Sequence, residues 1–194
     1  VKTKLSTRKE LSDISSRLGF AATVYFEKEK GKEKMHGVAD KVAYDFYFSD
    51  GQKETSANIL SLVEKSLIKN KKKLSLEDKA TQQIIVDLAF HGNLLYKDQI
   101  KKTITIDGPL QIVSNNPKYI PMEFVYTLPA PDDDATLCEN AHQALIEGKC
   151  KECYDKTSEP APCVCPFGFW NFSRVIERHN YTNKKSIKAE YSIK

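Results

Sequence analysis

The cysteines of this chain are confined to one short segment. All five of them lie between Cys138 and Cys165, although the chain has 194 residues. Their spacing is Cys138-x11-Cys150-x2-Cys153-x11-Cys165, and Cys163 stands two residues before the last. Such clustering indicates a shared role, which can be metal binding, disulfide bonding or redox chemistry.

Metal binding explains the spacing best. Cys150 and Cys153 form a C-x-x-C knuckle, which can place two thiolates on one tetrahedral ion. One further cysteine stands on each side of this knuckle, at equal separation, and completes a set of four. The sequence therefore predicts a structural Zn²⁺ site whose ligands are Cys138, Cys150, Cys153 and Cys165.

Several alternatives stay open at this stage. Cys163 can replace Cys165 as a ligand or lie as a small buried apolar residue, and His142 can replace Cys138. The cysteines can also be free thiols or a disulfide pair. A redox-active C-x-x-C would need a preceding strand and a helix N-terminus at the knuckle, whereas residues 141–148 have the pattern of a short helix ending in glycine.

The composition around the cysteines also favours a metal. Residues 127–166 contain five prolines, one glycine and many charges, but few large apolar side chains. Such a segment buries too little surface to offset an ordering entropy of about 1–2 kcal/mol per residue. A structural metal worth on the order of 10 kcal/mol makes up part of the difference.

The overall composition is that of a soluble globular protein, with 40% hydrophobic and 29% charged residues. No apolar run has the length of a membrane span, and the first residues contain no apolar signal region. We therefore expect a cytoplasmic protein, a setting in which clustered cysteines favour metal over disulfides. Because the chain begins with Val1, we expect it to be a processed product or an excised piece.

Positive charge is concentrated in the first half of the chain. Residues 1–73 hold 16 Lys and Arg against 10 Asp and Glu, and they include the run Lys69, Lys71, Lys72 and Lys73. Nucleic-acid contacts would favour aromatic residues or glycines interleaved with the basic residues. These lysines have no such pattern. We interpret the run as a solvated loop between helices and do not expect nucleic-acid binding.

Hydrophobic periodicity predicts an α+β (or α/β) fold with an N-terminal hairpin, two helices, a small sheet and a zinc-stapled insertion. The predicted helices span residues 55–70, 75–99 and 171–179. The predicted strands span residues 20–27, 38–48, 103–106, 110–114 and 120–126, and a charged turn at residues 28–34 joins the first two. We divide the chain into an α/β core (1–137), a zinc module with an aromatic run (138–180) and a tail (181–194).

Four other features carry specific expectations. Gly92 inside a predicted helix indicates close packing of another backbone, because such a glycine costs about 1 kcal/mol against alanine. His36 is expected on the surface of the hairpin loop. The run of aspartates at residues 132–134 lacks the glycine and spaced carboxylates of a cation loop and is expected as a solvated turn. Trp170 and its aromatic neighbours are expected in a core over the zinc module rather than in an exposed partner patch.

One part of the chain resembles a known family. Residues 92–96 (GNLLY), 108–113 (GPLQIV) and 121–124 (PMEF) follow one another as in the opening part of CHAT domains, which are caspase-like (clan CD) domains. The run from Cys165 through His179 also looks like cysteine-containing insertions in some bacterial CHAT proteins. The resemblance extends from about Ser75 to Asn180.

The family's activity is cysteine proteolysis by a His/Cys dyad, whose His sits in a His-Gly pair at the end of a strand. The His-Gly pairs of this chain begin at His36 and His91, and both precede the Pro-x-Glu segment. The resemblance therefore implies a non-catalytic regulatory or scaffolding part of a CHAT-type protein in bacterial defence or signalling. Its partner would be another protein or the remainder of the parent chain.

Two other function classes stay open. The first is a zinc-ribbon module that binds nucleic acid or a partner through the basic half of the chain. The second is a cysteine protease with an unrecognised dyad, drawn from His142 or His179 and one cysteine. The second class takes a thiolate away from the zinc site and has no evident oriented base.

Overall fold

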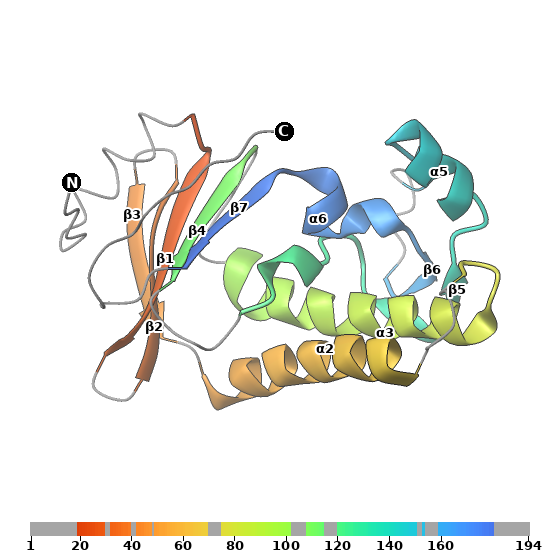
Figure 1. The fold of residues 1–194 in the computed structure, drawn as a ribbon, viewed down its shortest axis with the longest axis horizontal. Coiled ribbons are helices and arrows are strands. Elements are labelled where there is room, and N and C mark those ends of the chain that lie inside the picture. Colours follow the sequence, from red (N-terminus) through yellow and green to blue (C-terminus); the bar gives the residue numbers. More distant parts are fainter. Residues whose placement is uncertain are drawn as a thin grey trace. The chain divides into compact units, whose positions relative to one another are not determined.

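Two compact units make up the structure. The computed structural model describes residues 19–29, 32–39, 42–47, 49–69, 75–101, 108–114, 120–150, 153 and 159–180. The first unit comprises residues 1–47, 108–119 and 177–194, and the second comprises residues 48–107 and 120–176. Each unit is therefore assembled from segments that are separated in the sequence, as the colours in Figure 1 show.

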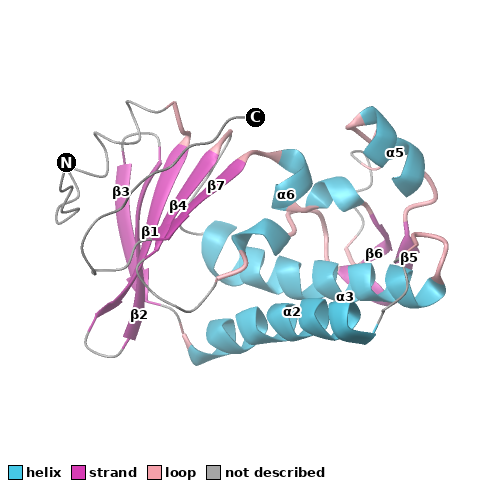
Figure 2. Cartoon of the chain, viewed as in Figure 1, coloured by secondary structure: helices cyan, strands magenta, loops and turns pink. Residues whose placement is uncertain are grey.

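The first unit contains a five-stranded sheet with the strand order β3-β2-β1-β4-β7. Neighbouring strands β1, β2 and β3 pair antiparallel, whereas β1 and β4 pair parallel. Figure 2 shows the sheet in magenta. The strands are β1 (Ala22–Glu29), β2 (Lys32–Ala39), β3 (Val42–Tyr47), β4 (Leu110–Ser114) and β7 (Ile176–Asn180).

The two neighbouring parallel strands of this sheet are buried on both faces. Residues 22–26 of β1 and all residues of β4 are buried, which fits their nearly continuous apolar sequences. Two polar residues, Thr23 and Gln111, are partners in the parallel register. Thr23 Oγ1 donates a hydrogen bond to Gln111 Oε1 at 3.3 Å, so these buried polar groups satisfy one another.

The predicted hairpin is a three-stranded antiparallel meander. Strands β1 and β2 together take up most of the predicted charged turn, and His36 lies in β2 rather than in a loop: it is half-buried, with its ring centroid 6.3 Å from that of Tyr25. The register sets Glu27 opposite Lys34 and Glu29 opposite Lys32, so residues that suggested a turn are partners in neighbouring strands.

Two long helices, α2 (Asp50–Lys69) and α3 (Lys79–Leu95), pack together in the second unit (Figure 1). Ile59 of α2 and Leu88 and Ala89 of α3 are buried. Helix α3 begins four residues later than predicted, and its N-cap is Asp78, because Asp78 Oδ2 accepts the Thr81 amide hydrogen at 3.3 Å. Beyond Leu95 the helix continues into a π-helical turn, η1 (Tyr96–Ile100).

Gly92 lies where α3 touches another backbone, as predicted. A β-carbon at this position would lie 2.0 Å from the Phe124 carbonyl oxygen and 3.1 Å from the Tyr126 nitrogen. The neighbouring Asn93 reaches the same segment, since its Nδ2 donates to the Leu128 carbonyl at 2.7 Å. The absence of a side chain at Gly92 therefore lets residues 124–128 pack directly on α3.

The rest of the second unit consists of short elements. β5 (Pro131–Leu137) and β6 (Ala161–Val164) form a parallel two-stranded sheet, and the predicted α+β class is confirmed. The other elements are α5 (Ala141–Glu147), α6 (Trp170–Ser173) and the 3₁₀ turns η2 (Met122–Phe124) and η3 (Pro166–Gly168). Trp170 and Phe169 are buried as predicted, whereas Phe172 is 47% exposed.

Three predicted elements have a different structure. Residues 132–134 lie in β5 rather than in a turn, with Asp133 and Asp134 exposed and Asp132 half-buried. Residues 120–126, predicted to be extended, contain the 3₁₀ turn η2. The helix predicted for residues 171–179 ends at Ser173, and the chain enters β7, because pairing at the edge of the first unit's sheet replaces a weak helical pattern.

Three other sequence interpretations fall largely on residues outside the described ranges. These are the lysine run, of which Lys69 alone is placed as the last residue of α2, the strand predicted at residues 103–106, and the tail at residues 181–194. Among the helices in the described ranges, none combines the length and the apolar character that a membrane crossing needs.

Candidate metal centre

Strand pairing brings the first and last predicted ligands together. Cys138 directly follows β5, and Cys165 directly follows β6. Because these strands are parallel and Leu137 is the register partner of Val164, both strands end at the same edge of the small sheet. The Cys138 amide donates to the Val164 carbonyl at 2.9 Å, which extends the pairing to the cysteine itself.

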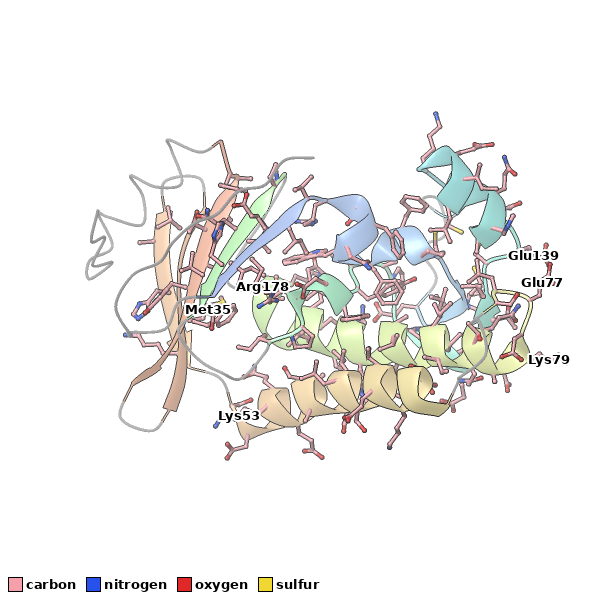
Figure 3. The ribbon with its side chains drawn as sticks, viewed as in Figure 1. Met35, Lys53, Glu77, Lys79, Glu139 and Arg178 are labelled. Carbon is pink, nitrogen blue, oxygen red and sulfur yellow. The ribbon has the colours of Figure 1, made fainter. Side chains whose placement is uncertain are left out.

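Helix α5 returns the chain to this edge and leads to the C-x-x-C knuckle. The helix ends at Gly148, whose φ of 72° is the left-handed conformation that suits glycine at a helix C-terminus. The Lys149 amide donates to the Ala144 carbonyl at 3.1 Å and completes this ending. Sulfur atoms, drawn in yellow in Figure 3, lie beside α5. The turn at Gly148 is thus what leads the chain from α5 to Cys150.

Three of the thiols converge closely. The sulfur atoms of Cys138, Cys150 and Cys153 all lie within 4.8 Å of one another, and the Cys138 and Cys153 sulfurs are 3.1 Å apart. This distance exceeds the S–S bond length of about 2.05 Å. It is shorter than the edge of about 3.8 Å that Zn–S bonds of about 2.3 Å give in a tetrahedron. A small outward movement of the thiols would therefore fit the ion.

The fourth predicted ligand adjoins this group. The Cys165 thiol interacts with the thiols of Cys150 and Cys153, and Cys165 belongs to the same buried cluster as the other three. The structure places Cys138 in the cluster and leaves His142 exposed on α5, so Cys138 rather than His142 is the residue brought to the site.

The site is buried and apolar. Its four cysteines are between 2% and 7% exposed, and apolar side chains pack around them, namely Leu76, Ile85, Leu128 and Phe167. Burial, followed by the neighbouring thiols, raises the pKa of Cys153, and burial raises the pKa of Cys165 from 9.0 to about 11. Without a metal the Cys153 and Cys165 thiols hold their protons at neutral pH, and a bound cation would have to displace these protons.

Cys163 has a different environment. It lies in β6, half-buried, and packs against the cluster from the side. Together with Cys153, Cys165 and Tyr126 it lines a cavity of about 10 Å³. None of the five cysteines, all of which the structure describes, takes part in a disulfide.

Tyr126 supports the site and has no counterpart among the residues singled out from the sequence. Its hydroxyl oxygen accepts a hydrogen bond from the Cys165 amide at 3.2 Å, and its ring packs edge-on against Phe169 at 4.9 Å. Burial raises the pKa of Tyr126, so the phenol stays protonated. The available sequence signal for Tyr126 was its position as an aromatic residue at the end of an apolar stretch. Nothing in the sequence linked this residue to Cys165.

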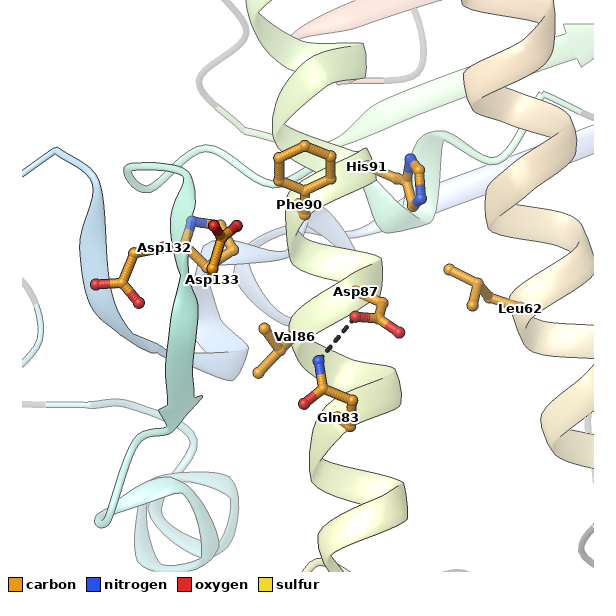
Figure 4. A pocket seen from close by; sticks show the side chains of 9 residues that line it. Leu62, Gln83, Val86, Asp87, Phe90, His91, Asp132 and Asp133 are labelled. Carbon is orange, nitrogen blue, oxygen red and sulfur yellow. Dashed lines mark hydrogen bonds between the residues drawn. The ribbon is translucent and has the colours of Figure 1, made fainter.

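A second cavity in this unit contains acidic side chains. It has a volume of about 240 Å³ and lies along α3 beside β5, as Figure 4 shows. Asp87, Asp132, Asp133, His91 and the partly exposed Phe90 are among its lining residues, and Asp87 Oδ1 accepts from Gln83 Nε2 at 2.9 Å. Among the described residues, the cysteine group alone brings three possible metal-ligand atoms of His, Cys, Asp or Glu within 4.8 Å of one another. The acidic cavity is therefore no alternative metal centre.

Comparisons with known proteins add no family to this description. Models of protein families, curated proteins and solved structures were compared with the chain, and none of them matches it. The resemblance to CHAT domains therefore remains a prediction from the sequence.

Proposed function

We propose that Cys138, Cys150, Cys153 and Cys165 hold one structural Zn²⁺ ion, which staples the short elements of the second unit together. The convergence of three buried thiols, with the fourth beside them, is the observation that carries this proposal. Soft thiolates favour zinc or iron over magnesium and calcium. A closed set of four cysteines in a buried site is typical of structural zinc.

The local architecture supports a structural role for this ion. The four cysteines lie on segments around β5, β6 and α5, which together bury few large side chains. The buried members of the cluster are cysteines and alanines with Leu137 as the one large side chain, and the other large apolar side chains packed against it are only partly buried. A metal would supply the cohesion that such small side chains do not provide, and it would leave no open coordination position for a substrate.

The direct test of this centre is elemental analysis of the purified protein. We expect one zinc ion per chain, and its removal by a chelator should destabilise the second unit. Iron in place of zinc would keep the site but change the metal, and it would give visible absorbance. A protein that retains neither metal under reducing conditions would contradict the proposal.

For the protein as a whole, the proposed role is that of a non-catalytic regulatory or scaffolding part of a CHAT-type caspase-like protein. It would bind a protein partner or the remainder of its parent chain, in bacterial defence or signalling. The sequence resemblance supports this role. The engagement of the thiols with one another also supports it, because a metal-bound thiolate is a poor free nucleophile.

A thiol-directed protease probe tests the non-catalytic part of this proposal. The zinc-loaded chain should show no rapid labelling at any cysteine and no peptide hydrolysis. A protease with an unrecognised dyad would show rapid labelling of a single cysteine, and this labelling would disappear in a His142→Ala or His179→Ala variant. Slow labelling of Cys163 that is independent of both histidines reflects its exposure and does not indicate a dyad.

A further inference from the structure

The chain has one thiol more than a tetrahedral site needs. Four cysteines fill the coordination sphere of a structural zinc ion, and the fifth, Cys163, packs against them. Cys163 is half-buried, whereas each of the other four is at most 7% exposed. An oxidant in solution therefore meets Cys163 first, since thiol oxidation depends on exposure.

We propose that Cys163 is an oxidation site through which a hydroperoxide opens the metal centre. This inference rests on the proposed zinc centre. Cys163 has two cluster thiols near it: Cys153, from the knuckle, and Cys165, two residues further along the chain. The cavity that the three residues share is at the lower limit for one water molecule, and this space lets the Cys163 sulfur turn inward.

Cys153 is the thiol that reacts with oxidised Cys163. Cys165 is two residues from Cys163 along an extended chain, and this separation of about 6.6 Å between Cα atoms is close to the upper limit of about 6.8 Å for a disulfide. Cys153 comes from a separate segment and lines the same cavity. A disulfide between Cys163 and Cys153 therefore requires a smaller change in the backbone of β6 than one between Cys163 and Cys165.

The first chemical step oxidises Cys163. Its sulfur, after loss of the thiol proton to water, attacks the terminal oxygen of the hydroperoxide. The S–O bond forms, the O–O bond breaks, and the leaving alkoxide or hydroxide takes up a proton to give an alcohol or water. Sulfur loses two electrons to the peroxide, and the product is a sulfenic acid.

The second step forms the disulfide. A Cys153 thiolate that has left the ion attacks the Cys163 sulfur, the S–S bond forms, and the S–O bond breaks. The departing hydroxide takes a proton and becomes water. Cys153 would then no longer be available as a ligand, so the remaining three thiolates would hold the ion more weakly and it would dissociate. The metal itself is neither oxidised nor reduced, because zinc has no redox chemistry here.

The experiment treats the zinc-loaded chain with hydrogen peroxide and follows metal release with a chromogenic chelator. Peptide mapping by mass spectrometry identifies the first disulfide that forms. We expect a Cys153–Cys163 disulfide, and release about tenfold slower in Cys163→Ser, which lacks the exposed thiol. The matched control is Thr136→Ser, which changes the register partner of Cys163 without removing a thiol and should release metal at the wild-type rate.

Two results would overturn the inference: equal release from Cys163→Ser and wild type, or a first disulfide between any other pair of cysteines. Treatment with dithiothreitol and zinc should restore the loaded protein. If the purified chain carries no metal, the proposed centre fails, but the mapping still decides the present inference. A first disulfide between Cys153 and Cys163 in that protein supports the oxidation site, and any other pairing rejects it.

Discussion

The ring of Tyr126 lies directly against the backbone of Gly168: a β-carbon at residue 168 would be 2.3 Å from Tyr126 Cε2. The backbone of the same tyrosine lies against Gly92 of α3. Its hydroxyl, in turn, accepts the Cys165 amide hydrogen. Two glycines thus let one aromatic residue connect the long helix with a predicted metal ligand.

Substitution of Gly92 should destabilise the second unit strongly. In Gly92→Ala, the new β-carbon would meet the Phe124 carbonyl oxygen at 2.0 Å, and the backbone contact would have to open. Overpacking of this kind costs about 1–3 kcal/mol or more. Chemical denaturation of the metal-loaded protein measures the loss.

The control for this change is Gly51→Ala, also in a helix. The nearest atom to a β-carbon there is Ser49 Oγ at 4.0 Å, so alanine should be neutral or stabilise by up to about 1 kcal/mol through its helix propensity. Equal destabilisation by the two alanines would show that the contact of Gly92 with residues 124–126 is not tight.

Removal of the Tyr126 hydroxyl should cost less, and its effect should be local. Tyr126→Phe keeps the ring contacts with Gly168 and Phe169 but leaves the buried Cys165 amide without its acceptor. A buried donor left unpaired costs about 1–3 kcal/mol. Urea denaturation should show this loss, and hydrogen exchange should be faster at the Cys165 amide than in wild type.

Tyr96→Phe serves as the comparison, because Tyr96 is half-buried at the start of η1. It should change stability by less than about 0.5 kcal/mol, as surface changes generally do. If Tyr126→Phe is as mild as Tyr96→Phe, the hydroxyl of Tyr126 does not support the site.

Several local features could be predicted from the sequence because the responsible signals are local. The helical period located α2 and α3, and the glycine inside α3 indicated the backbone contact at Gly92. The spacing of Cys138, Cys150 and Cys153 predicted a group that the structure brings together. Each of these signals lies within a stretch of about twenty residues.

What the sequence could not provide depends on distant pairing. The strand containing His36 was not predicted, because its alternating charges are typical of a turn. Only the register, which sets Glu27 opposite Lys34, shows that these residues pair in a sheet. Strand β7 was interpreted as helix because its pairing in the sheet involves segments far away in the chain. The contiguous ranges predicted as domains likewise cannot reveal units assembled from separated segments.

Metal binding should release protons, and their number reports the ligand set. The pKa of Cys165 is raised from 9.0 to about 11, and that of Cys153 is also raised. At pH 7 the thiols of Cys153 and Cys165 are therefore protonated before binding. Each thiolate formed on the metal then releases one proton, and affinity rises with pH and falls as the solution becomes acidic.

With four ligands, addition of zinc at pH 7 should release about four protons per ion, measured with an indicator dye in weak buffer. The Cys165→Ser variant should release about three. Release of about three protons from the wild type, unchanged by Cys165→Ser, would show that Cys165 is not a ligand.

Loss of one ligand should unfold the cysteine segment and spare the long helices. In Cys153→Ser, three thiolates remain, and the metal contribution of on the order of 10 kcal/mol is largely lost. The elements around the site, β5, β6 and α5, are short and contain few large apolar side chains. In contrast, α2 and α3 pack on one another, and their buried residues Ile59, Val86 and Ala89 do not belong to the cysteine cluster. Elemental analysis should find less zinc, and circular dichroism should retain most of the helical signal, while limited proteolysis should cut within residues 138–165.

The matched variant Cys163→Ser should bind one zinc ion per chain and resist proteolysis there as the wild type does, because Cys163 lies outside the predicted ligand set. Normal zinc content in Cys153→Ser would show that Cys153 is not a ligand, and loss of zinc in Cys163→Ser would show that Cys163 is one.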